Sequence, residues 1–193
     1  MSKREVKTDL WVAGQLDKCG IQYTPQGSDV KEIGEALSSA SKRGTGKTGF
    51  PEYVAVVNDF VIVIEDKADL GQHIKLTDSG ILDTSTKAVT DFAVNGAYFY
   101  AKHIAQKNSF RKVFAIGVSG DSRHHKITPL YVDDRESYRH LLTLSPLPCL
   151  LSRTFKNTMF GTSWRRKQTL KRRQKKSSRM LRSYMNIYVH TDR

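Results

Sequence analysis

The chain has 193 residues, of which 38% are hydrophobic and 26% charged, a length that suits one domain or one domain with an extension. It has no run of about 18 uncharged apolar residues, so we exclude an integral membrane protein. It opens on charged residues rather than on the apolar stretch of a signal peptide. With two cysteines, Cys19 and Cys149, it is predicted to be a cytoplasmic protein without a disulfide framework or a cysteine-built zinc site.

Positive charge is concentrated in the last quarter of the chain. Residues 1–145 carry 19 Lys and Arg against 18 Asp and Glu, whereas residues 146–193 carry 13 against one. A basic block of this kind attracts polyanions, of which nucleic acid is the commonest, and the alternative is an extension that does not pack. We therefore predict a folded domain over residues 1–142 and a basic extension, helical or partly disordered, over residues 143–193.

The first elements along the chain are two predicted helices. Apolar spacing indicates a helix over residues 5–18 and a more regular one over residues 29–42. In the second helix, Asp29 and Glu32 have the spacing of a capping box.

A β-hairpin is predicted next. Residues 53–57 and 61–64 are continuous apolar runs rich in β-branched side chains, which is typical of strands buried on both faces. Asn58 and Asp59 between them tolerate the backbone conformations of a tight turn.

A single long helix is predicted over residues 86–105, followed by strands over residues 113–118 and 127–132. The order of helix, hairpin, helix, strand and strand indicates an α/β or α+β domain.

Two further motifs are not assigned a function. The stretch Gly44–Thr48 is similar to a phosphate-binding loop, but Ser41 stands where that motif needs glycine, and the stretch precedes a strand instead of following one. His124 and His125 are neighbours in a loop with cationic residues, and we interpret them as a surface pair.

Three charged residues of the hairpin form the strongest candidate site. If Asn58 and Asp59 make the turn, Glu52 and Glu65 oppose each other across the strands with Cβ atoms about 5 Å apart. Two facing carboxylates repel unless a cation lies between them, and hard oxygen ligands suit Mg²⁺. Lys67 projects from the same face as Glu65, where it can contact a phosphate or a metal-bound water. The alternative is an ordinary cluster of solvated charges at the ends of two strands.

The hairpin and its charged residues resemble the conserved motif of a known nuclease family. The segment Gly49–Glu52, an apolar hairpin and then Ile64–Lys67 resembles the PD-(D/E)xK, or restriction-endonuclease-like, nucleases. More closely, residues 28–120 resemble the nuclease region that precedes an adenine-specific DNA methyltransferase in type I or combined restriction–modification proteins. The resemblance implies a restriction-endonuclease-like core of α/β class.

The resemblance also implies roles for individual residues. Glu52 and Glu65 would bind Mg²⁺, or Mn²⁺ in its place, and Lys67 would be the catalytic lysine. Glu52 stands where Asp is commoner in the family. A helix before the hairpin often supplies another acid, and we prefer Glu35 because Glu32 is explained by the capping box.

The later helix of such nucleases often carries Gln-x-x-x-Tyr. This chain has no glutamine there, and Asn95 and Tyr98 are its loose counterparts. Contacts to the DNA backbone are expected from cations before the hairpin and in the basic extension: Lys42, Arg43, Lys47, Arg165, Arg166, Lys167, Lys171, Arg172 and Arg173.

The sequence thus predicts a Mg²⁺-dependent DNA endonuclease module of a restriction–modification system, with phosphodiester hydrolysis as its reaction. Methyltransferase and specificity subunits or domains are the expected partners besides DNA, and a homodimer that cuts both strands is left open. The extension could be a native linker, a truncated end or sequence from another frame. Two alternatives keep the same fold: a non-catalytic nucleic-acid-binding module, and a fragment that needs its partners for any activity.

Overall fold

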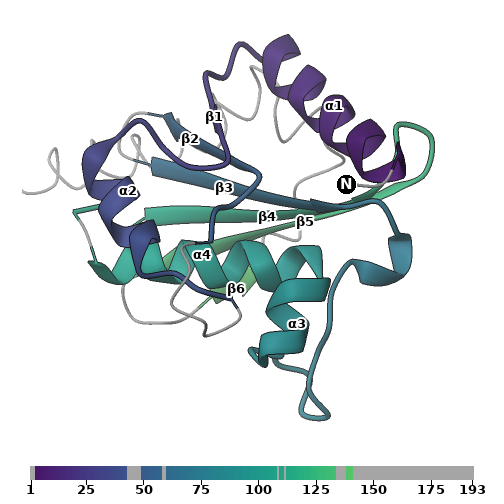
Figure 1. Ribbon diagram of the computed structural model, residues 1–193. Helices are drawn as coiled ribbons and strands as arrows, with labels where there is room; N and C mark the ends of the chain where they lie inside the picture. The colour runs from purple at the N-terminus through teal and green to yellow at the C-terminus, as the bar shows by residue number, and fades with distance from the viewer. Residues whose placement is uncertain are drawn as a thin grey trace, which may run out of the picture. The chain divides into compact units, whose positions relative to one another are not determined.

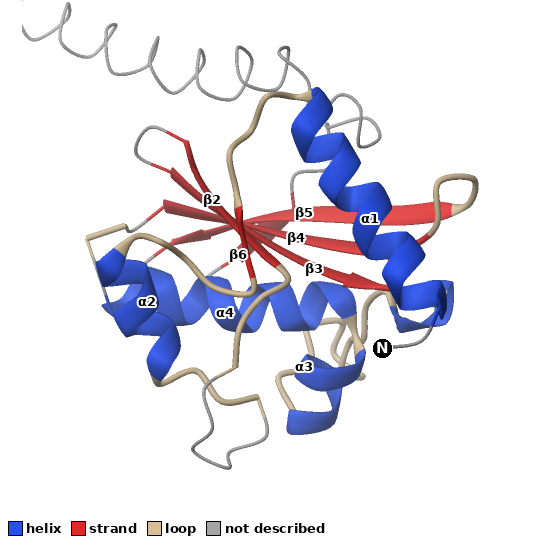
Figure 2. Cartoon of the chain, turned by 45° about the horizontal axis from the view of Figure 1, so that its top comes forward, coloured by secondary structure: helices blue, strands red, loops and turns tan. Residues whose placement is uncertain are grey.

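The computed structural model describes residues 3–42, 49–57, 60–107, 109–110, 112–133 and 138–140. All of them belong to the first of two units of the chain, residues 1–148. They form a mixed α/β fold in which helices lie on both faces of one sheet (Figures 1 and 2). The predictions for Arg43, Lys47 and residues 143–193 lie outside the described residues, among them those for Arg165, Arg166, Lys167, Lys171, Arg172 and Arg173.

The sheet has six strands whose spatial order follows the sequence. They are β1 (Thr24–Pro25), β2 (Tyr53–Val57), β3 (Phe60–Lys67), β4 (Lys112–Gly120), β5 (His125–Asp133) and β6 (Tyr138–His140). Neighbouring strands are antiparallel except β3 and β4, which are parallel. Because parallel strands end at the same edge of a sheet, the residues that end β3 and β4 lie together.

The helices divide between the two faces of the sheet. Helix α1 (Lys3–Lys18) covers one face, and α4 (Ala93–Lys107) lies against β3, β4 and β5 on the other, with α2 (Lys31–Ser38) and α3 (Thr86–Asp91) packed on α4 (Figure 1). A short 3₁₀ helix, η1 (Leu70–Gln72), follows β3. The main core fills the α4 side of the sheet with aliphatic and aromatic side chains, since alternate residues of each buried strand point toward that helix.

The predicted helix over residues 86–105 is wrong in one respect, because it is two helices. Phe92 has extended backbone angles and ends α3. The N–H of Val94 then bonds to the carbonyl of His73, at 2.9 Å, instead of continuing the helix of α3. Helix α4 therefore starts afresh, with its first turn attached to the segment that follows β3.

The predicted capping box is also wrong. Helix α2 begins at Lys31, two residues later than expected, and Val30 precedes it without a side-chain cap. The Asp29 carboxylate instead accepts a hydrogen bond from the hydroxyl of Thr24, at 3.0 Å. Asp29 therefore stabilises the loop before the helix rather than its first turn.

The described residues include no helix long and apolar enough to cross a membrane.

Candidate functional site

The hairpin has the register that its apolar runs and turn predict. Residues 53–57 of β2 pair with residues 60–64 of β3 in antiparallel register, from Tyr53 opposite Ile64 to Val57 opposite Phe60. Glu52 and Glu65 each lie one residue beyond the Tyr53–Ile64 pair, so they oppose each other at the open end of the hairpin.

Glu65 is a buried carboxylate with one oxygen occupied and one free. Only 1% of the residue is exposed. Its Oε2 accepts a hydrogen bond from the Nζ of Lys42 at 2.6 Å, whereas Oε1 has no hydrogen-bond partner among the described residues. A buried charged oxygen without a partner is costly, so Oε1 is suited to receive a cation or a donor that the chain does not supply.

Two residues of α4 shape the space around this ion pair. A Cβ atom at Gly96 would lie 2.9 Å from the Nζ of Lys42 and 3.1 Å from the Oε2 of Glu65, so any larger residue would force this pair to shift. One turn further along α4, the ring of Tyr100 lies 4.6 Å below the Lys42 ammonium. Burial and then the charges of Glu65 and Glu52 raise the pKa of the Tyr100 hydroxyl.

Glu52 and Asp66 complete a cluster of acids at the ends of β2 and β3. Burial raises the pKa of Glu52, and the charge of Glu65 raises it further. Burial also raises the pKa of Asp66, to about 8, with added repulsion from Glu52, Asp9 and Glu65. Asp66 is 7% exposed and its Oδ2 has no hydrogen-bond partner within the described part of the chain. Because side chains alternate along a strand, Asp66 points to the opposite face of the sheet from Glu65, and the two acids share the end of β3.

Lys67 is the next residue along β3 on the same face as Glu65. It is partly exposed, and its ammonium lowers the pKa of Glu52 and of Asp66 against the larger effect of burial. Its Cα pairs with that of Ser119 across the parallel ladder. The three predicted residues Glu52, Glu65 and Lys67 thus lie at one edge of the sheet.

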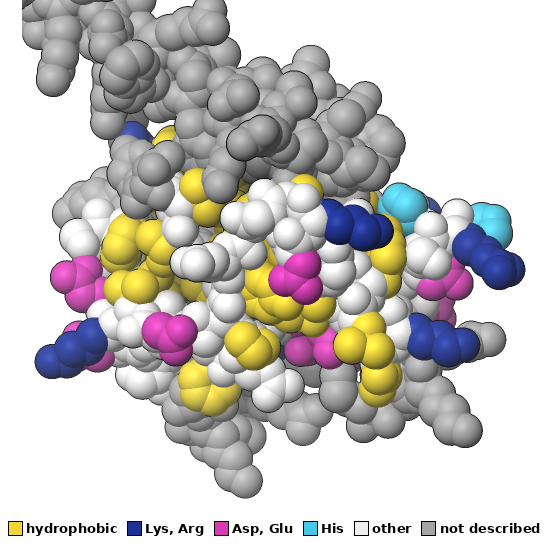
Figure 3. Space-filling model, turned by 90° about the horizontal axis from the view of Figure 1, so that it is seen from above, with side chains coloured by type: hydrophobic (Ala, Val, Ile, Leu, Met, Phe, Trp, Pro, Cys, Tyr) yellow, Lys and Arg dark blue, Asp and Glu magenta, His cyan; other side chains and the backbone are white. Residues whose placement is uncertain are grey.

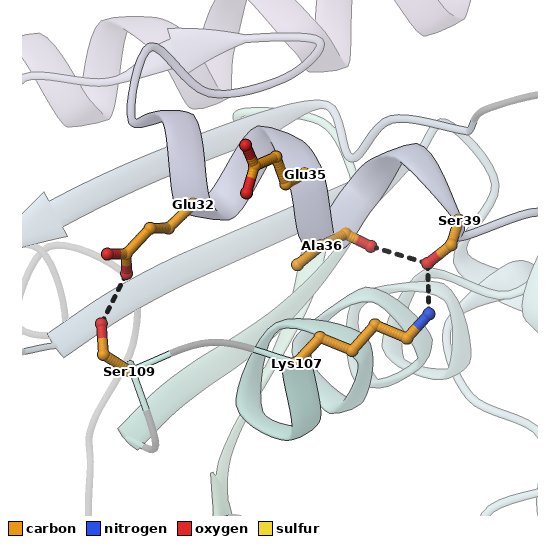
Figure 4. A pocket seen from close by; sticks show the side chains of 6 residues that line it. All are labelled: Glu32, Glu35, Ala36, Ser39, Lys107 and Ser109. Atoms are coloured by element: carbon orange, nitrogen blue, oxygen red, sulfur yellow. Dashed lines mark hydrogen bonds between the residues drawn. The ribbon is translucent and has the colours of Figure 1, made fainter.

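Glu35 is not brought to these acids. It lies on the exposed side of α2, where 66% of its side chain is accessible and where it pairs with Lys31 at 3.8 Å. With Glu32 it lines a polar pocket of about 380 Å³ that also includes Lys107 and Ser109, and Glu32 accepts a 2.5 Å hydrogen bond from Ser109 (Figure 4). This pocket is beside the last turn of α4, whereas Glu65 contacts Gly96 near its start.

The residues expected to stand for the helix motif have other roles. Asn95 is fully buried, and its side chain bonds to both main-chain groups of Lys75 and to the carbonyl of Asp83. Tyr98 packs edge-on against Tyr138. The α4 residues that face Glu65 are instead Gly96 and Tyr100, which the sequence analysis did not select.

A second polar cluster, formed by His73, Ser119 and Thr128, lies near the same ends of β3 and β4. The ring of the buried His73 bonds through Nε2 to the hydroxyl of Thr128 at 2.8 Å and through Nδ1 to that of Ser119 at 2.9 Å. Burial and then the charge of Lys126 lower the pKa of His73 to about 4. The imidazole is therefore neutral at pH 7, with both ring nitrogens engaged.

The donor set at the acids fits a hard divalent cation. No group of three or more His, Cys, Asp or Glu side chains arranged to hold a metal is found among the described residues. Mg²⁺, however, usually binds one or two carboxylates and completes its shell with water or substrate phosphate. Glu52 and Glu65, whose Oε1 has no hydrogen-bond partner among the described residues, provide such a pair.

The chain has a relative among known proteins. Over 138 residues the chain is 37% identical to the type II restriction enzyme and methyltransferase RM.BcgI of Heyndrickxia coagulans. The chain is related to a restriction–modification enzyme. The alignment covers 70% of this chain but only 22% of the relative, so the chain corresponds to about a fifth of that protein. The relative is of type II, which agrees with the combined enzymes rather than with the type I systems that the resemblance also suggested. No protein-family model and no solved structure matches the chain.

Proposed function

We propose that the domain formed by residues 1–142 is a metal-dependent DNA endonuclease module of a restriction–modification protein. The observation that carries the proposal is the buried carboxylate of Glu65, with one oxygen lacking a partner among the described residues, next to the partly exposed Glu52 that precedes the opposed strand. The related restriction enzyme supports DNA as the substrate. Methyltransferase and specificity parts, which such a module would need for methylation and site choice, are proposed as its partners.

In this proposal Glu52 and Glu65 hold Mg²⁺, for which Mn²⁺ can substitute. When bound, a divalent cation supplies Lewis-acid stabilisation of phosphoryl charge and lowers the pKa of a coordinated water. Lys67 lies beside these acids at the edge of the sheet, where its ammonium can donate to a non-bridging phosphate oxygen. Burial of Glu65 among apolar strand residues keeps bulk water from screening these charges.

The test is cleavage of supercoiled plasmid by the full chain with Mg²⁺ or Mn²⁺. Glu65→Gln keeps the shape of the side chain but removes its charge, and we expect nicking and linearisation to fall about a thousandfold, which is about 4 kcal/mol on the barrier. Lys67→Ala should lower cleavage about a hundredfold, since one charge-assisted contact to the phosphate is lost. Asp78→Asn, an exposed loop acid, is the matched control and should cleave as the parent does.

Other results would assign the domain differently. If the parent binds DNA without cleaving it, and Glu65→Gln binds equally well with and without Mg²⁺, the domain is a non-catalytic nucleic-acid-binding module. Cleavage that begins only after a methyltransferase or specificity partner is added would make the chain a partner-dependent nuclease. Cleavage that is equal in the parent and in Glu65→Gln would contradict the proposed site.

A further inference from the structure

Lys42 was expected to be an exposed contact to the DNA backbone, and the structure places it elsewhere. Only 14% of its side chain is accessible. Its ammonium is held by the Oε2 of Glu65 at 2.6 Å on one side and by the ring of Tyr100, 4.6 Å away, on another. A lysine buried in this way cannot reach a phosphate without breaking a charge-assisted bond in a poorly solvated place.

The chain is built around this lysine. Gly96 leaves the space that its ammonium occupies, since a Cβ there would lie within 2.9 Å of Nζ. At Gly49 a Cβ would lie 2.6 Å from the Tyr100 hydroxyl, so a side chain at that position would displace the ring below Lys42. Three segments far apart in sequence therefore meet to hold one ammonium group against Glu65.

We propose that Lys42 is a positioning residue for metal binding, which holds Oε2 of Glu65 so that Oε1 faces the cation site. The proposal rests on the proposed function, because it assigns Lys42 a role toward the cation that Glu52 and Glu65 would bind. A carboxylate with one oxygen held by a cationic donor offers its other oxygen in a fixed direction. Groups that orient a metal ligand in this manner typically contribute 10- to 100-fold in metal affinity.

The test is the affinity of the full chain for Mn²⁺, measured without DNA from the electron paramagnetic resonance signal of the free ion. Lys42→Met keeps the length of the side chain without its donor, and we expect Mn²⁺ to bind about tenfold more weakly or worse. Circular dichroism and the unfolding midpoint show whether the variant is folded.

Gly96→Ala tests the same contact with every charge retained. The added methyl group would lie 2.9 Å from the Lys42 Nζ, 3.0 Å from the main-chain oxygen of Val89 and 3.1 Å from the Glu65 Oε2. Of these the ammonium, at the end of a flexible side chain, moves most easily, so Mn²⁺ affinity should fall about threefold or more. Gly34→Ala is the matched control, because a Cβ in that helix meets nothing closer than a main-chain oxygen at 3.8 Å. It should bind Mn²⁺ as the parent does.

The remaining outcomes overturn the inference in distinguishable ways. Tighter Mn²⁺ binding by Lys42→Met would mean that the ammonium competes with the metal for Glu65. Unchanged Mn²⁺ affinity with a higher KM for plasmid would make Lys42 a DNA contact after all. A parent whose Mn²⁺ binding equals that of Glu65→Gln would overturn the proposed function together with this inference, whereas the first two results leave the proposed function intact.

Discussion

Two clusters of polar side chains, most of them buried, lie near the ends of β3 and β4. The acid cluster consists of Glu52, Glu65 and Asp66 at the ends of β2 and β3. The polar cluster of His73, Ser119 and Thr128 connects the segment after β3 to β4 and β5. We consider Asn95 with it, because its amide connects the same segment to α4. Lys67, directly after Asp66, is opposed by Ser119 across the ladder. In the two clusters, Glu65, Asp66, His73, Asn95 and Ser119 are buried, whereas Glu52 and Thr128 are partly exposed.

The clusters differ in how their hydrogen bonds are satisfied. Both ring nitrogens of His73 and both ends of the Asn95 amide have partners. Glu65 and Asp66 each have a buried oxygen without one among the described residues. Buried polar groups in folded proteins are nearly always paired, and unpaired carboxylates that repel one another are concentrated at functional sites. The polar cluster therefore serves the fold, while the acid cluster lowers stability in a way that a bound cation would reverse.

The largest expected effect on stability is at Asp66. Its pKa of about 8 lies above that of an unfolded aspartate, so the folded state binds the proton more tightly. Stability is therefore lost as the pH rises from about 4 to about 8. Asp66→Asn removes the ionisation and should raise the free energy of unfolding by about 4 kcal/mol at pH 7. Urea denaturation of the full chain without metal measures it.

The pH dependence distinguishes this cause from a packing effect. Between pH 7 and pH 8, where His73 is largely neutral in both the folded and the unfolded state, the parent should become less stable while Asp66→Asn stays nearly level. Asp78→Asn, with an exposed carboxyl, is the control and should change stability by less than about 0.5 kcal/mol. An Asp66→Asn variant less stable than the parent at every pH would mean that the carboxyl has a partner in solution.

The polar cluster should respond with the opposite sign. Asn95→Ala removes three hydrogen bonds to the main chain of Lys75 and Asp83. We expect the free energy of unfolding to fall by about 3 kcal/mol, because each main-chain group loses its partner. The same urea experiment measures this. Stability within about 0.5 kcal/mol of the parent would show that water replaces the amide, and the contrast between the clusters would disappear.

The titration of His73 gives the polar cluster a pH dependence of its own. Its pKa of about 4 is below that of an unfolded histidine, so the unfolded state takes up the proton first, and stability is lost as the pH falls from 6.5 toward 4. His73→Gln can still hydrogen bond but does not titrate. Between pH 7 and pH 5 the parent should therefore lose about 2 kcal/mol relative to this variant. Parallel losses in the two proteins would place the acid sensitivity elsewhere.

The hairpin and its site residues could be predicted because their geometry is local. Two apolar runs separated by Asn58-Asp59 fix the register, and the register alone places Glu52 opposite Glu65 with Lys67 two residues on. The strands of the hairpin and of residues 112–133 followed from β-branched composition for the same reason. Nothing distant along the chain was needed for these predictions.

Contacts between distant segments could not be predicted. Lys42, Gly96 and Tyr100 meet at Glu65 only because α4 crosses the sheet at that point. The apolar periodicity of the sequence continues through Phe92 and gives no sign of the break between α3 and α4. That break depends on a hydrogen bond from the N–H of Val94 to the carbonyl of His73. Local patterns contain no signal for a partner some twenty residues away.

The smallest expected effect is at Glu35, which the family resemblance favoured as the helix acid. Its carboxylate is 66% accessible and pairs with Lys31, and a surface pair of this kind contributes about 1 kcal/mol or less. It lines the pocket beside Lys107, about three turns and about 16 Å along α4 from Gly96. We therefore expect Glu35→Ala to change plasmid cleavage and Mn²⁺ affinity by less than about threefold, in the same assays as Glu65→Gln.

A large loss of both plasmid cleavage and Mn²⁺ affinity in Glu35→Ala would mean that Glu35 belongs to the acid cluster. Because α2 makes its most extensive contacts with α4, Glu35 could reach Glu65 only if α2 moved along that helix when metal or DNA binds. The Lys31–Glu35 pair would then have to break, and Lys31→Ala should enhance cleavage rather than leave it unchanged. If Lys31→Ala is silent while Glu35→Ala is inactive, Glu35 acts through the fold of α2, which a lower unfolding midpoint of Glu35→Ala would reveal.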